Sequence, residues 1–183
     1  MSQTITRRSA VLIAAGAAGV TAAGLVGWSR FDIGGRFFNP LRLDTLALKP
    51  VAGLTRADGA PSPGFGARDF AEHPRLVVLF ASWCPPCRDE HPTLHALARR
   101  LDAPIYGALY RDSAEGAANF LRMFGNPFAA IGDDSNGYFA RLVGARGVPA
   151  TLVVAPGPKI ALRIDGPLDA KIIEDKLMPA LRG

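Results

Sequence analysis

The amino-acid sequence predicts an α/β layer fold with a central mixed β-sheet flanked by helices, and three observations support this class. Short apolar runs typical of buried strands alternate along the chain with stretches of helical periodicity, as they do in layered folds. Two late strand candidates flank a Pro-Gly-Pro turn, so part of the sheet is expected to be antiparallel. The length of 183 residues, 49% of them hydrophobic, suits one globular domain with a short appendage.

The first elements of the domain lead up to the residues that carry the functional prediction. Residues 45–48 form a short strand candidate, and the Gly- and Pro-rich segment 53–66 predicts a turn or hairpin region. Residues 76–81 are uniformly apolar, which is typical of a strand buried on both faces. Residues 84–101 have apolar side chains at three- and four-residue spacing and predict a helix soon after that strand.

The later elements continue the alternation of strand and helix. Further strands are expected at 104–110, 128–131, 150–155 and 159–164. Further helices are expected at 113–124, 135–143 and 168–181. Ser113 is the expected N-cap of the first of these helices, and Pro167 is expected to open the last, which is amphipathic.

The N-terminal segment has the features of a targeting sequence. Residues 9–28 are uncharged and follow Arg7-Arg8, a pattern that resembles the twin-arginine export signal. A helix of this length spans about 30 Å, enough to cross a membrane, although a buried N-terminal helix is the alternative. We expect the chain to be divided into a signal or membrane anchor at 1–29, a linker at 30–43 and a folded domain at 44–183. This places the domain in the bacterial periplasm, exported or tethered to the inner membrane.

The charge distribution argues against a nucleic-acid-binding domain. The formal net charge is +5, of which residues 1–43 contribute +4 and residues 44–183 only +1. A nucleic-acid binder needs a concentrated basic face on its folded domain, and no such cluster is visible in the sequence. We therefore expect no nucleic-acid partner.

The two cysteines form a C-x-x-C motif, Trp83-Cys84-Pro85-Pro86-Cys87, at the junction of the buried strand and the next helix. At a helix N-terminus, unpaired N–H groups and the helix dipole stabilise a thiolate, so Cys84 is expected to be the nucleophile. Cys87 is close enough to form a disulfide with Cys84, and we expect it to be more buried, with the higher pKa. A static disulfide is the alternative, but one that closes so short a loop stabilises the fold little.

A metal site is a further alternative, because His91 and His95 follow the cysteines at four-residue spacing. One continuous helix spreads four such ligands over about 16 Å, whereas zinc needs every ligand atom within about 2.3 Å of one point. We therefore expect no metal site. We also expect no soluble cofactor, because the two thiols of Cys84 and Cys87 can themselves carry the electrons of a redox reaction. A copper chaperone that uses the two thiols remains an alternative.

The sequence around the cysteines resembles the thioredoxin superfamily, and within it the CcmG/DsbE group of periplasmic thiol–disulfide proteins that serve cytochrome c maturation. The resemblance covers about residues 44–183. It rests on the following segments: 80–88 around the C-x-x-C motif, Glu90-His91-Pro92, Tyr110-Arg111-Asp112, Gly125-Asn126-Pro127-Phe128 and Gly147-Val148-Pro149-Ala150-Thr151. The expected architecture is accordingly a thioredoxin-like fold.

The resemblance implies roles for several residues. Cys84 would attack a substrate disulfide and Cys87 would resolve the mixed disulfide. Pro149 would be a cis-proline that exposes the backbone of Val148 to an extended substrate strand. Trp83, Pro85 and Pro86 would also contact the substrate.

Glu90 lies one turn beyond Cys87, so its carboxylate is expected to face the dithiol and to accept the proton of Cys87. A solvated surface acid is the alternative. The sequence departs from its relatives at two positions. Val78 stands where thioredoxin has a buried acid, which favours Glu90 as the relay, and Ala150 replaces an acid that often follows the cis-proline in the CcmG/DsbE group.

The function expected from these observations is thiol–disulfide exchange in the periplasm. The resemblance implies apocytochrome c or a maturation factor as the disulfide substrate, and a membrane dithiol protein as the electron donor. A general disulfide reductase, oxidase or isomerase is an alternative, because the sequence does not give the direction of electron flow.

Overall fold

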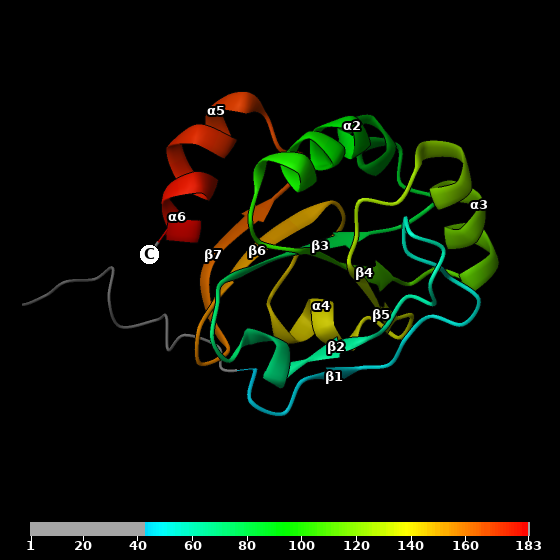
Figure 1. The fold of residues 1–183 in the computed structure, drawn as a ribbon, viewed down its shortest axis with the longest axis horizontal. Coiled ribbons are helices and arrows are strands. Elements are labelled where there is room, and N and C mark those ends of the chain that lie inside the picture. Colours follow the sequence, from blue (N-terminus) through cyan, green and yellow to red (C-terminus); the bar gives the residue numbers. More distant parts are fainter. Residues whose placement is uncertain (1–42, 183) are drawn as a thin grey trace, which may run out of the picture. The chain divides into compact units, whose positions relative to one another are not determined.

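A five-stranded mixed sheet forms the centre of the domain, with the strand order β5-β4-β3-β6-β7 (Figure 1). The computed structural model describes residues 43–182, so the expected signal or anchor at 1–29, and the linker except for Leu43, lie outside the described residues. The strands are β3 (Arg75–Phe80), β4 (Ile105–Tyr110), β5 (Ala130–Asp134), β6 (Ala150–Ala155) and β7 (Lys159–Asp165). Strands β3, β4 and β5 are parallel, whereas β6 and β7 run antiparallel to their neighbours, which confirms the mixed sheet.

The helices and the N-terminal hairpin cover the two faces of this sheet. The helices are α2 (Pro85–Arg100), α3 (Ala114–Phe124), α4 (Tyr138–Leu142) and a C-terminal helix of three consecutive parts: α5 (Ala170–Ile172), the π-helical η2 (Ile173–Leu177) and α6 (Met178–Arg182). The hairpin consists of β1 (Ala47–Leu48) and β2 (Phe65–Gly66) and leads into the 3-10 helix η1 (Ala67–Phe70).

Alternation along β3 divides the core into two layers. Leu76, Val78 and Phe80 pack with α2, α3 and the C-terminal helix, whereas Val77 and Leu79 pack with α4 and the hairpin. Figure 1 shows α2 and α4 on opposite sides of the sheet. All five residues are buried, as expected for a strand covered on both faces.

The structure corrects the predicted boundaries around β5 and α4. The strand begins at Ala130 rather than at 128 and continues to Asp134, and the helix predicted for 135–143 covers only Tyr138–Leu142. The reason is the buried carboxylate of Asp134, which accepts hydrogen bonds from the N–H groups of Phe139 and Ala140. This cap fixes the helix start beyond Gly137, whose φ of 66° lies in the left-handed region. Burial raises the pKa of Asp134.

The C-terminal helix also starts later than predicted. Its N-cap is Asp169, whose side chain accepts from the N–H of Ile172, and not a residue next to Pro167. Leu168 lies just before this cap, and its N–H donates to Glu90 on α2. The helix is interrupted by a π turn, in which the N–H of Met178 reaches the carbonyl of Ile173. Pro179 follows this turn and supplies no N–H of its own.

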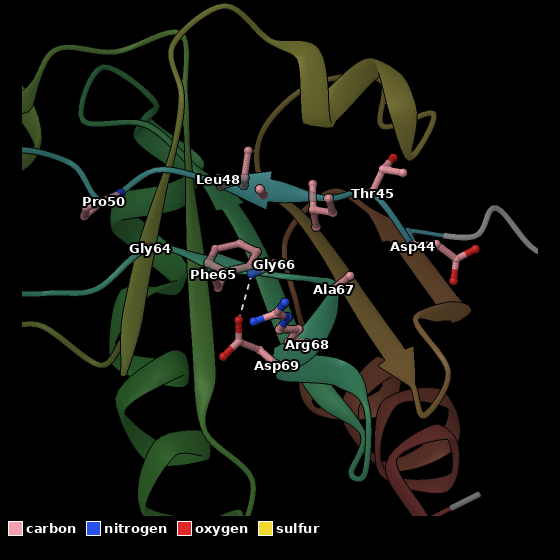
Figure 2. Close-up of a pocket in the computed structure, with 12 residues that line it drawn as sticks. Asp44, Thr45, Leu48, Pro50, Gly64, Phe65, Gly66, Ala67, Arg68 and Asp69 are labelled. Atoms are coloured by element: carbon pink, nitrogen blue, oxygen red, sulfur yellow. Dashed lines mark hydrogen bonds between the residues drawn. The ribbon is translucent and has the colours of Figure 1, made fainter.

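The hairpin occupies the region for which the sequence predicted a short strand and a turn or hairpin. β1 pairs antiparallel with β2, and the glycines on either side of Phe65 permit a close approach. A Cβ on Gly64 would stand 2.1 Å from the carbonyl oxygen of Leu48. A pocket of about 520 Å³ lies over this hairpin and contains none of the predicted site residues (Figure 2). Within residues 43–182, no helix is long and apolar enough to cross a membrane.

The predicted N-cap of α3 is confirmed and is open to test. The hydroxyl of Ser113 accepts a hydrogen bond from the N–H of Gly116 at 3.0 Å. We expect Ser113→Ala to lower the free energy of unfolding by about 1 kcal/mol, because one N–H of the first turn loses its partner. Chemical denaturation measures this difference. Ser135→Ala is the matched control, because Ser135 is exposed and caps no helix; an equal loss in both variants contradicts the capping role.

Candidate dithiol active site

The Cys84–Cys87 pair lies where the chain leaves β3 and enters α2. Cys84 is the N-cap of the helix, with extended backbone angles, and its N–H donates to the carbonyl of Ala81 in the preceding turn. Cys84 and Cys87 are joined by a disulfide, with their Cα atoms 5.3 Å apart. The predicted pairing of the two cysteines is confirmed.

The local backbone gives the sulfur of Cys84 one hydrogen-bond donor. Pro85 and Pro86 occupy the first two positions of the helix and have no N–H to offer. The first N–H inside the helix is that of Cys87, which donates to Sγ of Cys84 at 3.2 Å. When the disulfide is reduced, the same donor and the helix dipole face a thiolate at this position. This arrangement favours Cys84 as the ionised member of the pair.

Burial separates the two cysteines only slightly. Cys84 is 3% exposed and Cys87 is 2% exposed, so the direction of the expected difference in burial is observed, but both cysteines are buried and the difference is very small. Trp83 and Pro85 on either side of Cys84 are exposed. Cys84 is therefore a buried residue between two exposed neighbours, and the disulfide connects it to Cys87 in the first turn of α2.

Glu90 is buried, which overturns the alternative of a surface acid. It is 4% exposed and lies three residues after Cys87 on α2. Its Oε2 accepts a hydrogen bond from the N–H of Leu168 at 3.0 Å, and its buried Oε1 has no hydrogen-bond partner among residues 43–182. Burial raises the pKa of Glu90 to about 7, and the bond from Leu168 opposes part of that rise. The carboxyl group can therefore take up or release a proton near neutral pH.

The loop before β6 lies beside the cysteines because of the sheet register. Ala150 pairs with Leu79 of β3, so the Val148–Pro149 peptide, which is cis, lies next to the strand end that leads to Cys84. The carbonyl of Pro149 accepts from the N–H of Gly166 at 2.9 Å. Among the described residues, none makes a backbone hydrogen bond with Val148, which is half-buried. The cis geometry predicted for Pro149 is confirmed.

A second loop holds the residues just before Cys84, and sequence reasoning did not assign it a role in the site. The indole N–H of Trp83 donates to the carbonyl of Arg111 at 3.1 Å, and the N–H of Ser82 donates to Asp112. A Cβ on Gly116 would stand 2.7 Å from the hydroxyl oxygen of Ser82 and 2.8 Å from Oδ1 of Asp112, so a larger residue at position 116 would crowd this loop. The Tyr110-Arg111-Asp112 segment of the resemblance was the only signal in the sequence for this contact.

The two histidines of α2 contact the end of α3 instead of the cysteines. Nε2 of His91 lies 2.8 Å from the carbonyl oxygen of Gly125, and Nε2 of His95 lies 3.0 Å from that of Phe124. Burial lowers the pKa of His91, so its ring is neutral near pH 7. Within residues 43–182, no group of three or more His, Cys, Asp or Glu side chains is arranged to hold a metal ion.

Comparisons with known proteins agree with this geometry, although no family model matches the chain. The thiol:disulfide interchange protein CycY of Rhizobium leguminosarum bv. viciae is 41% identical over 106 residues, which are 58% of this chain and 57% of that protein. The probable thiol:disulfide interchange protein DsbE-2 of Pasteurella multocida (strain Pm70) is 34% identical over 132 residues, which are 72% of this chain and 69% of that protein. The match to the first relative thus spans little more than half of its length.

A solved structure supports the same fold. A secreted Mycobacterium tuberculosis disulfide oxidoreductase, described as homologous to E. coli DsbE, has a TM-score of 0.57 at 20% sequence identity, over 77% of this chain and 96% of that one. The fold is thioredoxin-like, and a disulfide joins the two cysteines at the start of α2. The chain belongs to the DsbE family of thiol:disulfide interchange proteins.

The raised pKa of Glu90 predicts a specific pH dependence of stability. The folded protein holds this proton up to about pH 7, whereas in the unfolded chain the pKa of the glutamate has its ordinary value of 4.5. The resulting stabilisation is complete below pH 4.5 and is lost as the pH rises through 7. Relative to Glu90→Gln, wild type should lose about 3 kcal/mol across this window, measured by denaturation of the disulfide form, in which the cysteines do not titrate.

Glu115→Gln is the matched control for this measurement, because Glu115 is an exposed acid in the first turn of α3. This control variant removes an exposed carboxyl group and should not reproduce the pH-dependent change expected between wild type and Glu90→Gln. If the difference in free energy of unfolding between wild type and Glu90→Gln does not change with pH, the raised pKa of Glu90 is contradicted.

Proposed function

We propose that this protein is a periplasmic thiol:disulfide oxidoreductase that reduces disulfide bonds in client proteins with the Cys84–Cys87 dithiol. The observation that carries the proposal is the position of Cys84 as the N-cap of α2, with the N–H of Cys87 directed at its sulfur. This donor lowers the free energy of the thiolate relative to the thiol. The family to which the chain belongs, whose members are named for thiol:disulfide interchange, supports the same activity.

The reaction proceeds in two exchanges. The thiolate of Cys84 attacks one sulfur of the client disulfide, forms a mixed disulfide and releases the other client sulfur as a thiolate. Cys87 then loses its proton and attacks Sγ of Cys84, which forms the Cys84–Cys87 disulfide and releases the second client sulfur. Two electrons pass to the client, and its two sulfurs end as thiols after taking up protons. A dithiol protein in the membrane is the reductant that restores the Cys84–Cys87 thiols.

Glu90 is proposed to accept the proton of Cys87 in the second exchange. Its buried Oε1 has no hydrogen-bond partner, and a pKa of about 7 matches the requirement for a base that works near neutral pH. Val78 is buried in β3, at the position where the resemblance to thioredoxin places an acid, so it offers no alternative base. The helical spacing of three residues puts Glu90 and Cys87 on one side of α2.

The client and the location follow from the resemblance to the CcmG/DsbE group. We propose apocytochrome c, or a factor of its maturation, as the disulfide substrate, held as an extended strand beside Val148 and Pro149 with Trp83, Pro85 and Pro86 at the edge. The unpaired backbone of Val148 and the exposure of Trp83 support this binding mode. The Arg7-Arg8 pair and the uncharged residues 9–28 support export or tethering at the inner membrane.

The two cysteines are expected to behave differently when each is removed. Cys87→Ala should accumulate a mixed disulfide between Cys84 and the client, because the resolving thiol is absent. Cys84→Ser should form none. The measurement is non-reducing electrophoresis and mass spectrometry of periplasmic extract. Full turnover by Cys87→Ala, or trapping through Cys87 in the Cys84→Ser variant, would reverse or remove the assigned roles.

The proton-relay role of Glu90 predicts a change that depends on pH. We expect Glu90→Gln to slow release of the reduced client by about 10-fold or more near pH 7, because Cys87 loses its base. The deficit should shrink as the pH rises toward the pKa of a thiol, where solvent removes the proton unaided. Single-turnover kinetics across pH measure the effect, with Glu115→Gln as the control. Parallel profiles for wild type and Glu90→Gln would exclude Glu90 from the mechanism.

A further inference from the structure

Two arginines meet at one point of the surface next to the Trp83 side of the dithiol. A Cβ on Gly137 would stand 2.9 Å from Nε of Arg111 and 3.2 Å from Nη1 of Arg141, so both side chains pass this glycine closely. Both arginines are exposed. Trp83, the neighbour of Cys84, donates to the carbonyl of Arg111, which connects this point to the active-site loop.

Within residues 43–182, neither arginine forms an ion pair with a carboxylate. The carboxylates in this part of the fold already accept backbone N–H groups. Asp112 accepts from Ser82 and Ser113, and Asp134 accepts from Phe139 and Ala140. The guanidinium of Arg111 lies 5.3 Å from the ring centroid of Tyr110, and Nη1 of Arg141 donates to the carbonyl of Asn136. Both cations therefore keep donors available for an external acceptor.

Aromatic residues also lie near this point. Cε2 of Tyr110 would stand 3.2 Å from a Cβ on Gly137. Trp83 is 55% exposed, and Tyr138, the residue that follows Gly137 in the chain, is 51% exposed. The rings of Trp83 and Tyr110 have their centroids 6.4 Å apart. Arg111 has a φ of 45°, an unfavourable left-handed angle for a residue other than glycine. At this angle its carbonyl reaches Trp83 while its side chain covers Tyr110. Strained residues of this kind concentrate at binding sites.

We propose that Trp83, Tyr110, Arg111, Tyr138 and Arg141, here called the arginine ridge, bind an acidic segment of the client polypeptide next to its disulfide. A carboxylate of the client would lie between the two guanidinium groups, and apolar parts of the segment would lie on the exposed rings. The inference rests on the proposed function, because the client reaches the ridge only when its disulfide is at Cys84.

A polypeptide fits the ridge better than a nucleic acid does. The net charge of residues 44–183 is only +1, which is too small to hold a polyanion by general attraction. Two guanidinium groups beside exposed rings suit one or two carboxylates on an amphipathic chain. The ridge thus adds charge selection to the backbone pairing proposed beside Val148.

The test compares two disulfide peptides that differ only in charge. One carries glutamates beside its disulfide and the other carries glutamines. At low ionic strength, the reduced wild-type protein should react about 5- to 10-fold faster with the glutamate peptide than with the glutamine peptide. Added salt should lower the rate of reaction with the glutamate peptide more than the rate with the glutamine peptide. In the double variant Arg111→Gln/Arg141→Gln, this preference should fall to about 2-fold or less, measured by single-turnover kinetics.

The matched control is Arg99→Gln/Arg122→Gln, which removes the same formal charge at exposed positions near the ends of α2 and α3. It should keep the preference for the glutamate peptide. Equal rates of wild type with both peptides, or an equal loss of preference in the control, would overturn the ridge while leaving disulfide exchange intact. Failure of wild type to reduce either peptide would instead overturn the proposed function. The far-UV circular dichroism spectrum and the denaturation midpoint of the double variant, compared with those of the control variant, show that the double variant is folded.

Discussion

One hydrogen bond at the start of α2, from the N–H of Cys87 to the sulfur of Cys84, is the interaction on which the proposed chemistry depends. Pro85 and Pro86 remove the two donors that would otherwise precede it, so the stabilisation of a thiolate falls on this N–H and on the helix dipole. The prolines also hold the loop so that Cys84 remains an N-cap. The placement of the cysteines at the junction of β3 and α2 therefore determines their reactivity.

The rest of the fold keeps this junction in place and supplies a proton acceptor near it. Register with β6 brings the Val148–Pro149 peptide beside the end of β3, and the loop after β4 holds Trp83 through Arg111. Behind the cysteines, Glu90 joins α2 to the segment before α5 through the N–H of Leu168. That hydrogen bond lowers the free-energy cost of burying the carboxyl group. It occupies only Oε2, so Oε1 is available for proton transfer.

Most of the sheet and the central helix could be predicted from the sequence because their patterns are local. Local residue types were enough to predict three features: the apolar strand β3, the Ser113 cap and the Pro-Gly-Pro turn before β7. The short α4 could not be predicted, because the buried carboxylate of Asp134 accepts N–H groups from beyond Gly137 only in the folded chain. The same limit applies to the site: the cysteines and the proline were visible in a motif, whereas the contacts of Arg111 exist only in three dimensions.

The ionisation of Cys84 in the reduced protein tests the central claim most directly. The rate of alkylation by iodoacetamide, followed across pH with the modified residue identified by mass spectrometry, reports the pKa of each thiol. The account predicts that Cys84 reacts first, with a pKa well below the ordinary value of about 8.5, and that the pKa of Cys87 lies above that of Cys84. A pKa of Cys84 at or above the ordinary value, or preferential alkylation of Cys87, would contradict the account.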